Sequence, residues 1–489
     1  MASSPSEPVA TDITPPTEVE DLEDNLNDCD LKSPTPQLPD DGSGADINSC
    51  GSSTVYYEQE AFETYQHKVA QLCRDIGYGA PWKIERMKGG GYNRVIGLTL
   101  GSGQQRDYVL RIPREALDEV EMDNIKDQIA VTLFLAQYDF LHVPVTTAFD
   151  TTVNNILQCQ YVLQERIDGV ALQNIFYTLP LAEKLQIASA VAGIFLQLES
   201  VALEKPGRLV GNGDLPNRSD VAPRASKQIK IAGFRNSGIH DLPLIDKQPL
   251  VSMITSLLEI RKQRNLEWEE MVERCERLQV IAKEMEALGM MRGTDDDCGL
   301  WHWDLSASNI MIHQVTTTQS SDFASAQGKD EVPHQSERDG SASSEDFINV
   351  KQQSKPGSSS VDSTSTMKWV VSGVLDWDDV MSVPLVLARK PPFWLWIDED
   401  THGSIHECDP DAEAVPDLTE DELLIKAHFD QTMAQGSSSY IDDAYHRGPL
   451  LRALAKFAVY NFEQGVYWDQ YDGFVKLWKE YRKTLAKQK

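Results

Sequence analysis

The residues of this 489-residue chain most able to do chemistry stand in the stretch 300–312. There Asp304 is followed five residues later by Asn309, and then by a short apolar run with strand character. A carboxylate can accept the proton of a substrate hydroxyl, and an amide oxygen can help to hold Mg²⁺. Phosphoryl transfer from a nucleotide requires such a pair. We therefore take Asp304 as a candidate base and Asn309 as a candidate metal ligand.

Two further residues extend this group. Asp376 follows a second apolar stretch, 369–375, that is typical of a buried strand, and a kinase places its main metal ligand at such a point. His302 precedes Asp304 by two positions. Because Asp304 already fills the role of base, we interpret His302 as a catalytic-loop residue that orients the loop rather than as a proton carrier. Asp378 and Asp379 could support the metal ligands, but we favour a solvated strand end.

The elements that must position these residues begin near residue 56 with a short helix that runs to about 77. Short strand-like stretches and one amphipathic helix follow, over 82–87, 95–100, 108–113, 122–137 and 161–165. This order predicts a small antiparallel sheet that carries one helix. After residue 169 apolar residues recur at helical spacing, over 181–201, 250–260, 266–288 and 449–487.

A Ser-rich segment, 314–367, separates the strand after Asn309 from the strand before Asp376. Without it, a tight turn would join the two strands as a β-hairpin. Added loop length costs little free energy, so we predict a disordered insertion at a hairpin tip. A second segment, 1–55, is acidic and poor in apolar residues, and we predict a disordered tail there.

Composition excludes several classes of protein. The formal charge of −31 and the lack of a basic stripe argue against nucleic-acid binding. The seven cysteines form no CxxC pair, which favours reduced thiols in the cytoplasm or nucleus. The N-terminus has no pattern of a signal peptide, and no apolar run approaches a membrane span. Three acidic clusters, 295–297, 398–400 and 442–443, could attract a cationic substrate, although ordinary solvated loops are favoured.

Together these residues resemble the aminoglycoside phosphotransferase family, and in particular its fungal members of unassigned substrate. The likeness is strongest over 302–309, where Asp304 and Asn309 fall on the family's catalytic base and magnesium ligand. Asp376 falls on its second metal-binding aspartate. The resemblance covers about 56–480 outside the insertion. It implies an α+β, bilobal, protein-kinase-like fold, with an N-lobe at 56–168 and a mainly helical C-lobe at 169–489.

The resemblance also implies a nucleotide site in the cleft between the lobes. Gly89, Gly90, Gly91 and Asn93 fall on the family's nucleotide-covering loop, where glycine permits close approach to phosphate oxygens. The stretch 161–169 resembles the hinge, where the family binds the nucleobase through backbone groups. There the resemblance points to Glu165 and Ile167.

Two positions depart from the kinase pattern. The third strand carries Arg111 where a kinase has a lysine, and the helix carries Gln128, beside Asp127, where a kinase has a glutamate. Arginine can grip phosphate through two nitrogens but is not interchangeable with lysine. The resemblance also extends to the segment 391–396, which is similar to one typical of the fungal members. Its simpler interpretation is packing of the helical lobe.

We therefore predict Mg²⁺-dependent transfer of the γ-phosphoryl group of ATP or GTP to a hydroxyl of a small molecule. The main alternative is a pseudokinase-like nucleotide-binding or scaffold module, which Arg111 and the missing helix glutamate motivate. A protein or lipid kinase comes third, because Asp376 is followed by Trp-Asp rather than by Phe-Gly.

Overall fold

The computed structural model describes most of the chain after residue 58, namely 59–89, 92–101, 104–138, 142–213, 215–221, 229–235, 242–293, 298–302, 304–318, 365–378, 380–397, 417–460 and 465–488. All of these residues belong to one compact unit, Ser53–Lys489. The predicted tail, 1–55, and most of the predicted insertion lie outside the described residues.

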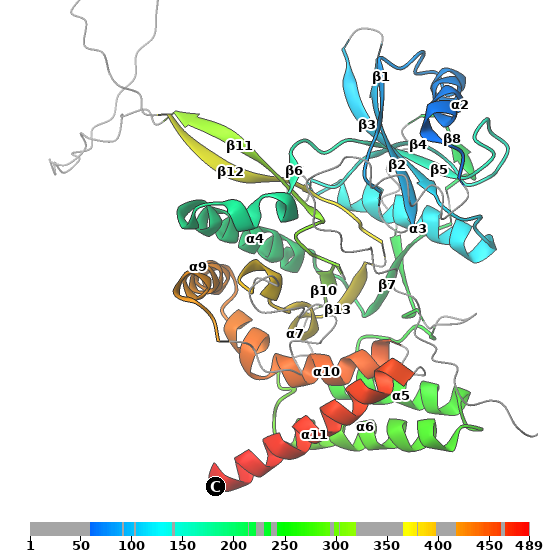
Figure 1. Cartoon of the computed structure of the whole chain (residues 1–489). Helices are drawn as coiled ribbons and strands as arrows, with labels where there is room; N and C mark the ends of the chain where they lie inside the picture. The colour runs from blue at the N-terminus through cyan, green and yellow to red at the C-terminus, as the bar shows by residue number, and fades with distance from the viewer. Residues whose placement is uncertain are drawn as a thin grey trace, which may run out of the picture. The chain divides into compact units, whose positions relative to one another are not determined.

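Six antiparallel strands form the first sheet, in the order β1-β2-β3-β5-β4-β8 (Figure 1). Their bounds are β1 Lys83–Arg86, β2 Asn93–Leu100, β3 Arg106–Pro113, β4 Thr146–Asp150, β5 Tyr161–Glu165 and β8 Arg218–Ser219. The predicted antiparallel sheet is therefore confirmed. Its edge strand β8 comes from beyond residue 168, the predicted end of the N-terminal lobe, because the chain returns from the helical part to pair with β4.

Two helices, rather than the predicted one, cover this sheet. α2 (Phe62–Asp75) presents apolar residues at a spacing of three or four, including Val69 and Leu72, and buries them against the inward side chains of β2 and β3. α3 (Glu119–Leu135) packs Ile129 and Leu133 with Phe149 of β4. A capping box fixes the start of α3, since the Asp118 carboxylate accepts from the Glu121 N–H.

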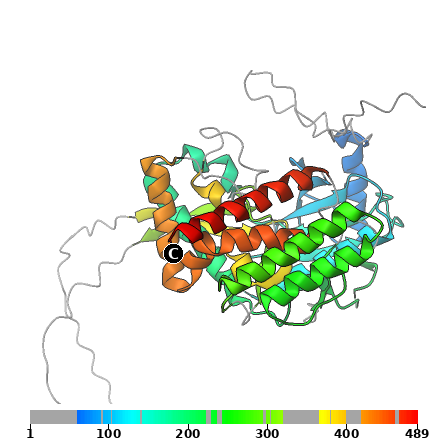
Figure 2. The same ribbon diagram turned by 90° about the horizontal axis from the view of Figure 1, so that it is seen from below.

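The rest of the described chain is mainly helical, as predicted. Its main helices are α4 Leu181–Ser200, α5 Leu250–Arg264, α6 Glu269–Ala287, α9 Glu420–Gly436, α10 Gly448–Val459 and α11 Gly465–Gln488. Viewed from below, α5, α6, α10 and α11 lie side by side (Figure 2) and share one apolar core. α4 and α9 pack together in a second core that also receives Ile310 and Val374 from beside the candidate site.

The helix α4 departs from the expectation that no apolar run approaches a membrane span. Among the described residues it is the one helix that is long and apolar enough, by length and composition alone, to cross a membrane. Glu183 and Lys184 precede its uncharged stretch and Glu199 follows it, so that the stretch, 185–198, is by itself shorter than a membrane span. In the structure its Val191 and Leu198 are buried in the core shared with α9.

Two smaller sheets hold the segments that carry the candidate site. One has the order β10-β13-β7-β9, and the other has the order β12-β11-β6. Their bounds are β6 Val170–Ala171, β7 Gly207–Gly211, β9 Ile229–Ala232, β10 Cys298–Trp301, β11 Ile310–Thr318, β12 Ser365–Val374 and β13 Met381–Pro384. β10 ends just before His302, β11 begins just after Asn309, and β12 ends two residues before Asp376. Strand ends therefore fix all three residues.

The predicted hairpin is present, but its predicted boundary was wrong. β11 and β12 pair antiparallel without a break from Ile312↔Val371 to Thr318↔Ser365. Residues 314–318 and 365–367, which were assigned to the insertion, are therefore strand. The reason is that threonine favours extended backbone, and a paired ladder can continue through polar sequence. Residues 319–364 lie outside the described part of the chain.

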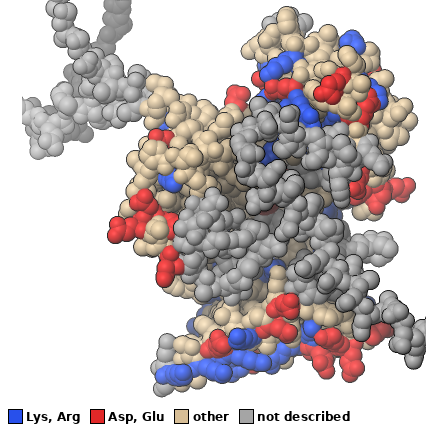
Figure 3. Space-filling view, viewed as in Figure 1, with Lys and Arg blue, Asp and Glu red and all other residues tan. Residues whose placement is uncertain are grey.

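Charges of both signs are mixed over the described face in Figure 3. One exception is the C-terminal end of α11, at the lower edge, where basic side chains gather. Five exposed lysines and arginines follow this helix: Lys476, Lys479, Arg482, Lys483 and Lys487. The expected absence of a basic stripe was therefore wrong for this helix, because a net charge averages over the whole chain. The Arg482 guanidinium pairs with Glu284 of α6 at 2.7 Å.

Candidate functional site

The loop between β10 and β11 is anchored by His302. The imidazole is 3% exposed, its Nε2 lies 3.0 Å from the Leu375 carbonyl oxygen, and its edge meets the Trp377 ring with centroids 4.9 Å apart. Burial lowers the pKa of His302 below its usual value, and Nδ1 has no hydrogen-bond partner among the described residues. A buried neutral imidazole that joins two loops fits the predicted orienting role.

Asn309 and Asp304 are held together by one amide group. Asn309 Nδ2 donates to the Asp304 carboxylate oxygen Oδ2 at 3.0 Å and to its main-chain oxygen at 2.9 Å. The Asp304 carboxylate itself is exposed. The Asn309 main-chain oxygen accepts from the Leu375 N–H at 2.7 Å. This contact ties the Asp304 loop to the residue next to Asp376, although 67 positions separate Asn309 from Asp376 in the sequence.

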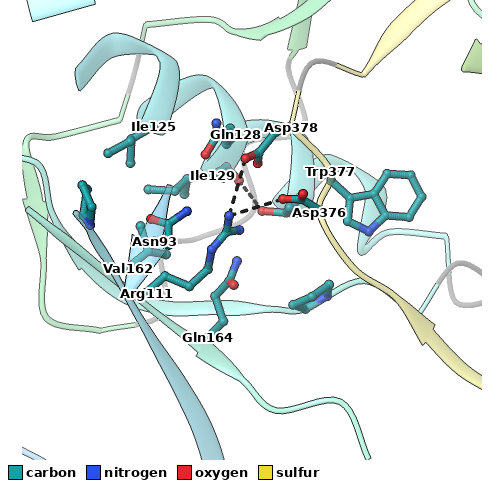
Figure 4. A pocket seen from close by; sticks show the side chains of 13 residues that line it. Asn93, Arg111, Ile125, Gln128, Ile129, Val162, Gln164, Asp376, Trp377 and Asp378 are labelled. Carbon is teal, nitrogen blue, oxygen red and sulfur yellow. Dashed lines mark hydrogen bonds and ion pairs between the residues drawn. The ribbon is translucent and has the colours of Figure 1, made fainter. Parts of the chain in front are cut away.

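Asp376 adopts an unusual backbone conformation two residues after the end of β12. Its φ angle is +60°, which places a non-glycine residue in the left-handed region. Such strain is tolerated where surrounding contacts over-determine the turn, and it is concentrated at functional sites. Here Trp377 supplies the anchor, since its buried indole N–H donates to the Val374 oxygen at 2.8 Å. The turn directs Asp376 toward the sheet of β1–β5 (Figure 4).

Arg111 of β3 reaches across to this turn. Its Nη2 lies 3.4 Å from Asp376 Oδ1 and 3.5 Å from Asp378 Oδ2 (Figure 4). The three side chains line one cleft together with Asn93, Gln128, Gln164, apolar residues of α3 and Val162 of β5. The cleft thus lies between strand β3, which carries Arg111, and the turn after β12, which carries Asp376 and Asp378.

The helix α3 offers Arg111 no carboxylate in the ordinary kinase position. Gln128, which a kinase would replace with glutamate, lines the cleft as a neutral amide. Asp127 beside it turns away: its carboxylate accepts from the Gly211 N–H at 2.9 Å and lies 3.3 Å from Arg208 Nη1. Burial raises the pKa of Asp127, against the lowering effects of the Gly211 N–H and Arg208.

The glycine-rich loop is described only at its ends. Gly90 and Gly91 lie outside the described residues. At Gly89 a side chain would not fit, because a Cβ would lie 2.4 Å from the Asn93 main-chain oxygen. Asn93 opens β2 and lines the cleft. The structure therefore brings Asn93 together with Arg111 and Asp376, as the sequence predicted.

The predicted hinge follows β5. The Glu165 N–H donates to the Val145 oxygen at 2.8 Å, so it is already satisfied, and Glu165 would meet a nucleobase only through its carbonyl oxygen. The Glu165 side chain points to the surface, 3.7 Å from Arg106. Ile167 lies two residues further on and approaches Gly373 of β12. Neither side chain lines the cleft.

The donor atoms beside the cleft suit Mg²⁺, a hard cation that binds oxygen. Because Asn309 Nδ2 makes both hydrogen bonds to Asp304, the Asn309 amide oxygen faces elsewhere. The Asp376 carboxylate is 44% exposed. No group of three or more His, Cys, Asp or Glu residues that could hold a metal occurs in the described part of the chain. A Mg²⁺ site here would therefore also need oxygens from a ligand, as is usual for this ion with nucleotides.

Sequence reasoning missed two residues at the site. Asp378 was interpreted as a solvated strand end, yet it pairs with Arg111. Trp394 was assigned to packing, yet its indole N–H donates to the Leu305 oxygen at 2.9 Å, directly beside Asp304. The Tyr177 hydroxyl in turn donates to the Trp394 oxygen at 3.2 Å. The only signals were the second acid of an Asp-Trp-Asp run and a tryptophan-rich segment of unassigned role.

Of the three acidic clusters that could attract a cationic substrate, two lie outside the described residues. In the third, Asp443 is buried and bound to Arg389 and Arg447 at 2.5 and 2.6 Å. It is therefore a structural residue, and neither a solvated loop residue nor a substrate contact. Asp442 beside it is 60% exposed.

One protein-family model matches this chain. Residues 83–321 match the family described as "Phosphotransferase enzyme family". This stretch contains the glycine-rich loop, Arg111, Asp304 and Asn309. It ends before Asp376, so the association of Asp376 with the other residues rests on the structure.

Among curated proteins, the chain is similar to "Altered inheritance of mitochondria protein 9, mitochondrial" from two strains of Candida albicans, WO-1 and SC5314. In each case the identity is 29% over 133 residues, which is 26% of this chain and 21% of the relative. The matched part of the chain therefore spans about a fifth of the length of these relatives.

Among solved structures, the chain is similar to three aminoglycoside phosphotransferases. APH(4)-Ia has 12% sequence identity over 84% of this chain and 98% of its own, with a TM-score of 0.39. APH(2'')-IIa, in a ternary complex with streptomycin and ATP, has 11% identity over 86% of this chain and 97% of its own, with a TM-score of 0.39. ADP-bound APH(2'')-Ib has 13% identity over 86% of this chain and 97% of its own, with a TM-score of 0.39. At TM-scores below 0.5 these likenesses carry no information on ligand or activity.

Proposed function

We propose that this chain, whose residues 83–321 match the phosphotransferase enzyme family, transfers the γ-phosphoryl group of a nucleoside triphosphate to a hydroxyl of a small molecule. The acceptor hydroxyl would lie at Asp304. The nucleotide phosphates would lie in the cleft between Arg111 and the turn at Asp376.

The observation that carries this proposal is the pair of contacts made by Asn309. Its side chain holds the Asp304 carboxylate at 3.0 Å, while its main chain holds the Leu375 N–H at 2.7 Å. A base for the acceptor and a carboxylate for the metal are thereby tied to one residue. Phosphoryl transfer depends mostly on positioning and charge neutralisation, and a rigid link between these groups supplies the positioning.

Each of the candidate site residues has its own task in the proposed reaction. Asp304 accepts the hydroxyl proton, and its exposure leaves the carboxylate open to an acceptor. Arg111 offers a guanidinium to the phosphate oxygens. Asn309 and Asp376 would hold Mg²⁺, which supplies positive charge to the transferred group when bound. His302 keeps the Asp304 loop in register with Leu375 through its buried ring.

A second candidate, a pseudokinase-like module that binds nucleotide without transfer, is favoured by one observation. Arg111 is already paired with Asp376 and Asp378, and the helix position is the neutral Gln128. In such a module these ion pairs would persist and the Asp304 carboxylate would have no task.

Transfer from radiolabelled ATP and GTP to a panel of small hydroxylated metabolites, with and without Mg²⁺, separates the two candidates. We expect transfer to at least one acceptor. Asp304→Asn keeps the shape of the side chain and removes its charge, so transfer should fall by about two to four orders of magnitude. Nucleotide binding, measured by calorimetry, should persist, since Asn309, Asp376 and Arg111 are unchanged.

Asp376→Ala is the complementary variant, because it removes a proposed metal ligand and leaves the base. It should abolish the Mg²⁺-dependent part of nucleotide binding. Transfer that survives Asp304→Asn unchanged would refute the role of this carboxylate. A parent protein that binds nucleotide and transfers nothing across the panel would favour the module without activity.

A further inference from the structure

We infer that Asp378 positions the Arg111 guanidinium, the task that a helix glutamate performs for the lysine of a kinase. This inference rests on the proposed function, since it concerns how the phosphate-facing cation of the same cleft is held. It assigns a role to the second acid of the run 376–378, which the sequence alone left as a solvated strand end.

The first ground is the arrangement of charge around Arg111. Two carboxylates, Asp376 and Asp378, lie within 3.5 Å of one guanidinium nitrogen, and both come from the turn after β12 (Figure 4). None of the residues that α3 contributes to the cleft, Ile125, Gln128, Ile129 and Thr132, is charged. The nearest acid on that helix, Asp127, is engaged with Gly211 and Arg208. The negative charge that faces Arg111 therefore comes from the turn after β12 and not from α3, the helix that carries the glutamate in a kinase.

The second ground is the division of labour between the two acids. Asp376 is the residue proposed to hold metal, and a carboxylate engaged with a cation is a weaker partner for a guanidinium. Asp378 then remains as the counter-charge that keeps Arg111 directed into the cleft. An arginine has several rotatable bonds, and a fixed carboxylate reduces the rotamer freedom that phosphate binding would otherwise have to remove.

The third ground is that the turn itself is rigid. Trp377, between the two acids, is 2% exposed, donates its indole N–H to Val374, and packs on the His302 ring. Because successive residues are fixed by this buried side chain, Asp376 and Asp378 keep a constant relation to each other. A partner placed on such a turn can hold Arg111 as firmly as one placed on a helix.

The test is a set of nucleotide dissociation constants, measured by calorimetry with ATP and GTP in the presence of Mg²⁺. Asp378→Asn should weaken binding by about tenfold, the scale of one charge-assisted contact. In an Arg111→Gln background the same change should have no further effect on nucleotide affinity, because the inferred effect of Asp378 on the nucleotide passes through Arg111. Gln128→Glu, which restores a carboxylate on the helix, should recover most of the affinity lost in Asp378→Asn.

Asp123→Asn is the matched control, since it removes one exposed carboxylate from α3 away from the cleft. It should leave the affinity unchanged. The inference is overturned if Asp378→Asn binds as the parent does, if its effect is equally large without Arg111, or if Gln128→Glu recovers nothing.

Failure of the proposed function gives a different result. If the parent protein binds neither nucleotide, that proposal fails, and the inference is decided in the unliganded protein. There the unfolding free energies of Arg111→Gln, Asp378→Asn and the double variant form a cycle. A non-additive cycle supports the positioning contact, and strict additivity overturns it.

Discussion

Two arginines of this protein each stand between two carboxylates, and they differ in almost every other respect. Arg389, just after the short helix α7 (Leu385–Ala388), donates from two nitrogens to Glu199 at 3.1 and 2.9 Å, and also to Asp443 at 2.5 Å. Its side chain is 10% exposed. Arg111 shares one nitrogen between Asp376 and Asp378 at 3.4 and 3.5 Å, and those carboxylates are 44% and 33% exposed.

The difference shows what each cluster is for. Around Arg389 every charge is paired at short range and withdrawn from water, and although burial lowers the pKa of Arg389, the hydrogen bonds to Glu199 and Asp443 raise it overall. Such a cluster fixes α4, α7 and the short π-helix Asp442–His446 relative to one another. Around Arg111 the contacts are long and partly exposed to solvent, so an incoming phosphate can replace one of them at small cost.

The strongest way to test this contrast is to remove Arg389. Arg389→Ala leaves the buried Glu199 and Asp443 without their shared partner, and breaking a buried ion pair costs about 3–5 kcal/mol. We expect a loss of this size in the unfolding free energy, measured by urea denaturation. The matched variant Arg111→Ala should cost less than about 1 kcal/mol, because its pairs are long and half-exposed.

Nucleotide affinity should reverse that order. Arg111→Ala should weaken binding by about tenfold or more, the scale of a lost charge-assisted contact to phosphate. A milder variant, Arg389→Lys, is the one to compare with it, since it keeps the charge and a folded protein in which affinity can be measured. If both arginine variants reduced stability alike and affinity alike, the contrast between the two clusters would be wrong.

The contrast also explains what the sequence could and could not predict. Asp304 and Asn309 could be proposed from the sequence because five residues of local sequence fix their spacing, and Asp376 because it follows an apolar stretch with strand character. Arg389 and Glu199 are 190 positions apart, and no local pattern announces that they meet. Asp443 was misinterpreted for the same reason: an acidic pair on its own predicts a solvated loop, and only the fold supplies its arginines.

The helices and strands also differ in how well the sequence predicted them. Long amphipathic helices such as α4 and α6 were predicted nearly to their ends, because their apolar spacing is local. β7, with the sequence Gly-Arg-Leu-Val-Gly, and β13, which is four residues long, were not predicted. Each is a short strand stabilised by partners distant in sequence, and its own residues carry too little periodicity to identify it.

His302 can show whether burial, or location in the candidate site, governs what a polar side chain contributes to stability. His302 lies in the candidate site, like Arg111, but is buried, like Arg389. Because burial lowers its pKa in the folded state, the unfolded chain binds a proton more readily. The stability that depends on the neutral ring is therefore complete above about pH 6.5 and is lost as the pH falls below that value.

We expect His302→Gln, whose amide can still donate to the Leu375 oxygen, to lose stability less steeply than the parent between about pH 6.5 and pH 5. Urea denaturation at a series of pH values measures the slope. His67→Gln, on the exposed face of α2, is the control and should follow the parent. Parallel profiles for the parent and His302→Gln would mean that location in the site, rather than burial, governs this histidine.

The smallest effect is expected at the hairpin of β11 and β12, at its end away from the candidate site. The strands stay paired as far as Thr318↔Ser365, so residues 319–364 can be deleted and the strand ends joined by a short Gly-containing turn. Closing a shorter loop costs little, and the hydrogen bonds of Asp304 and Asn309 and the ion pair of Asp376 described above all lie outside the deleted segment. We expect the unfolding free energy to change by no more than about 0.5 kcal/mol.

A deletion of 314–367 is the matched comparison, since it also removes the pairs from Gln314↔Trp369 outward and with them the end of the ladder. Thermal denaturation of both should show a larger loss for the longer deletion. Equal losses would mean that the outer pairs contribute nothing, and a loss of cooperative unfolding in the shorter deletion would mean that residues 319–364 support the fold.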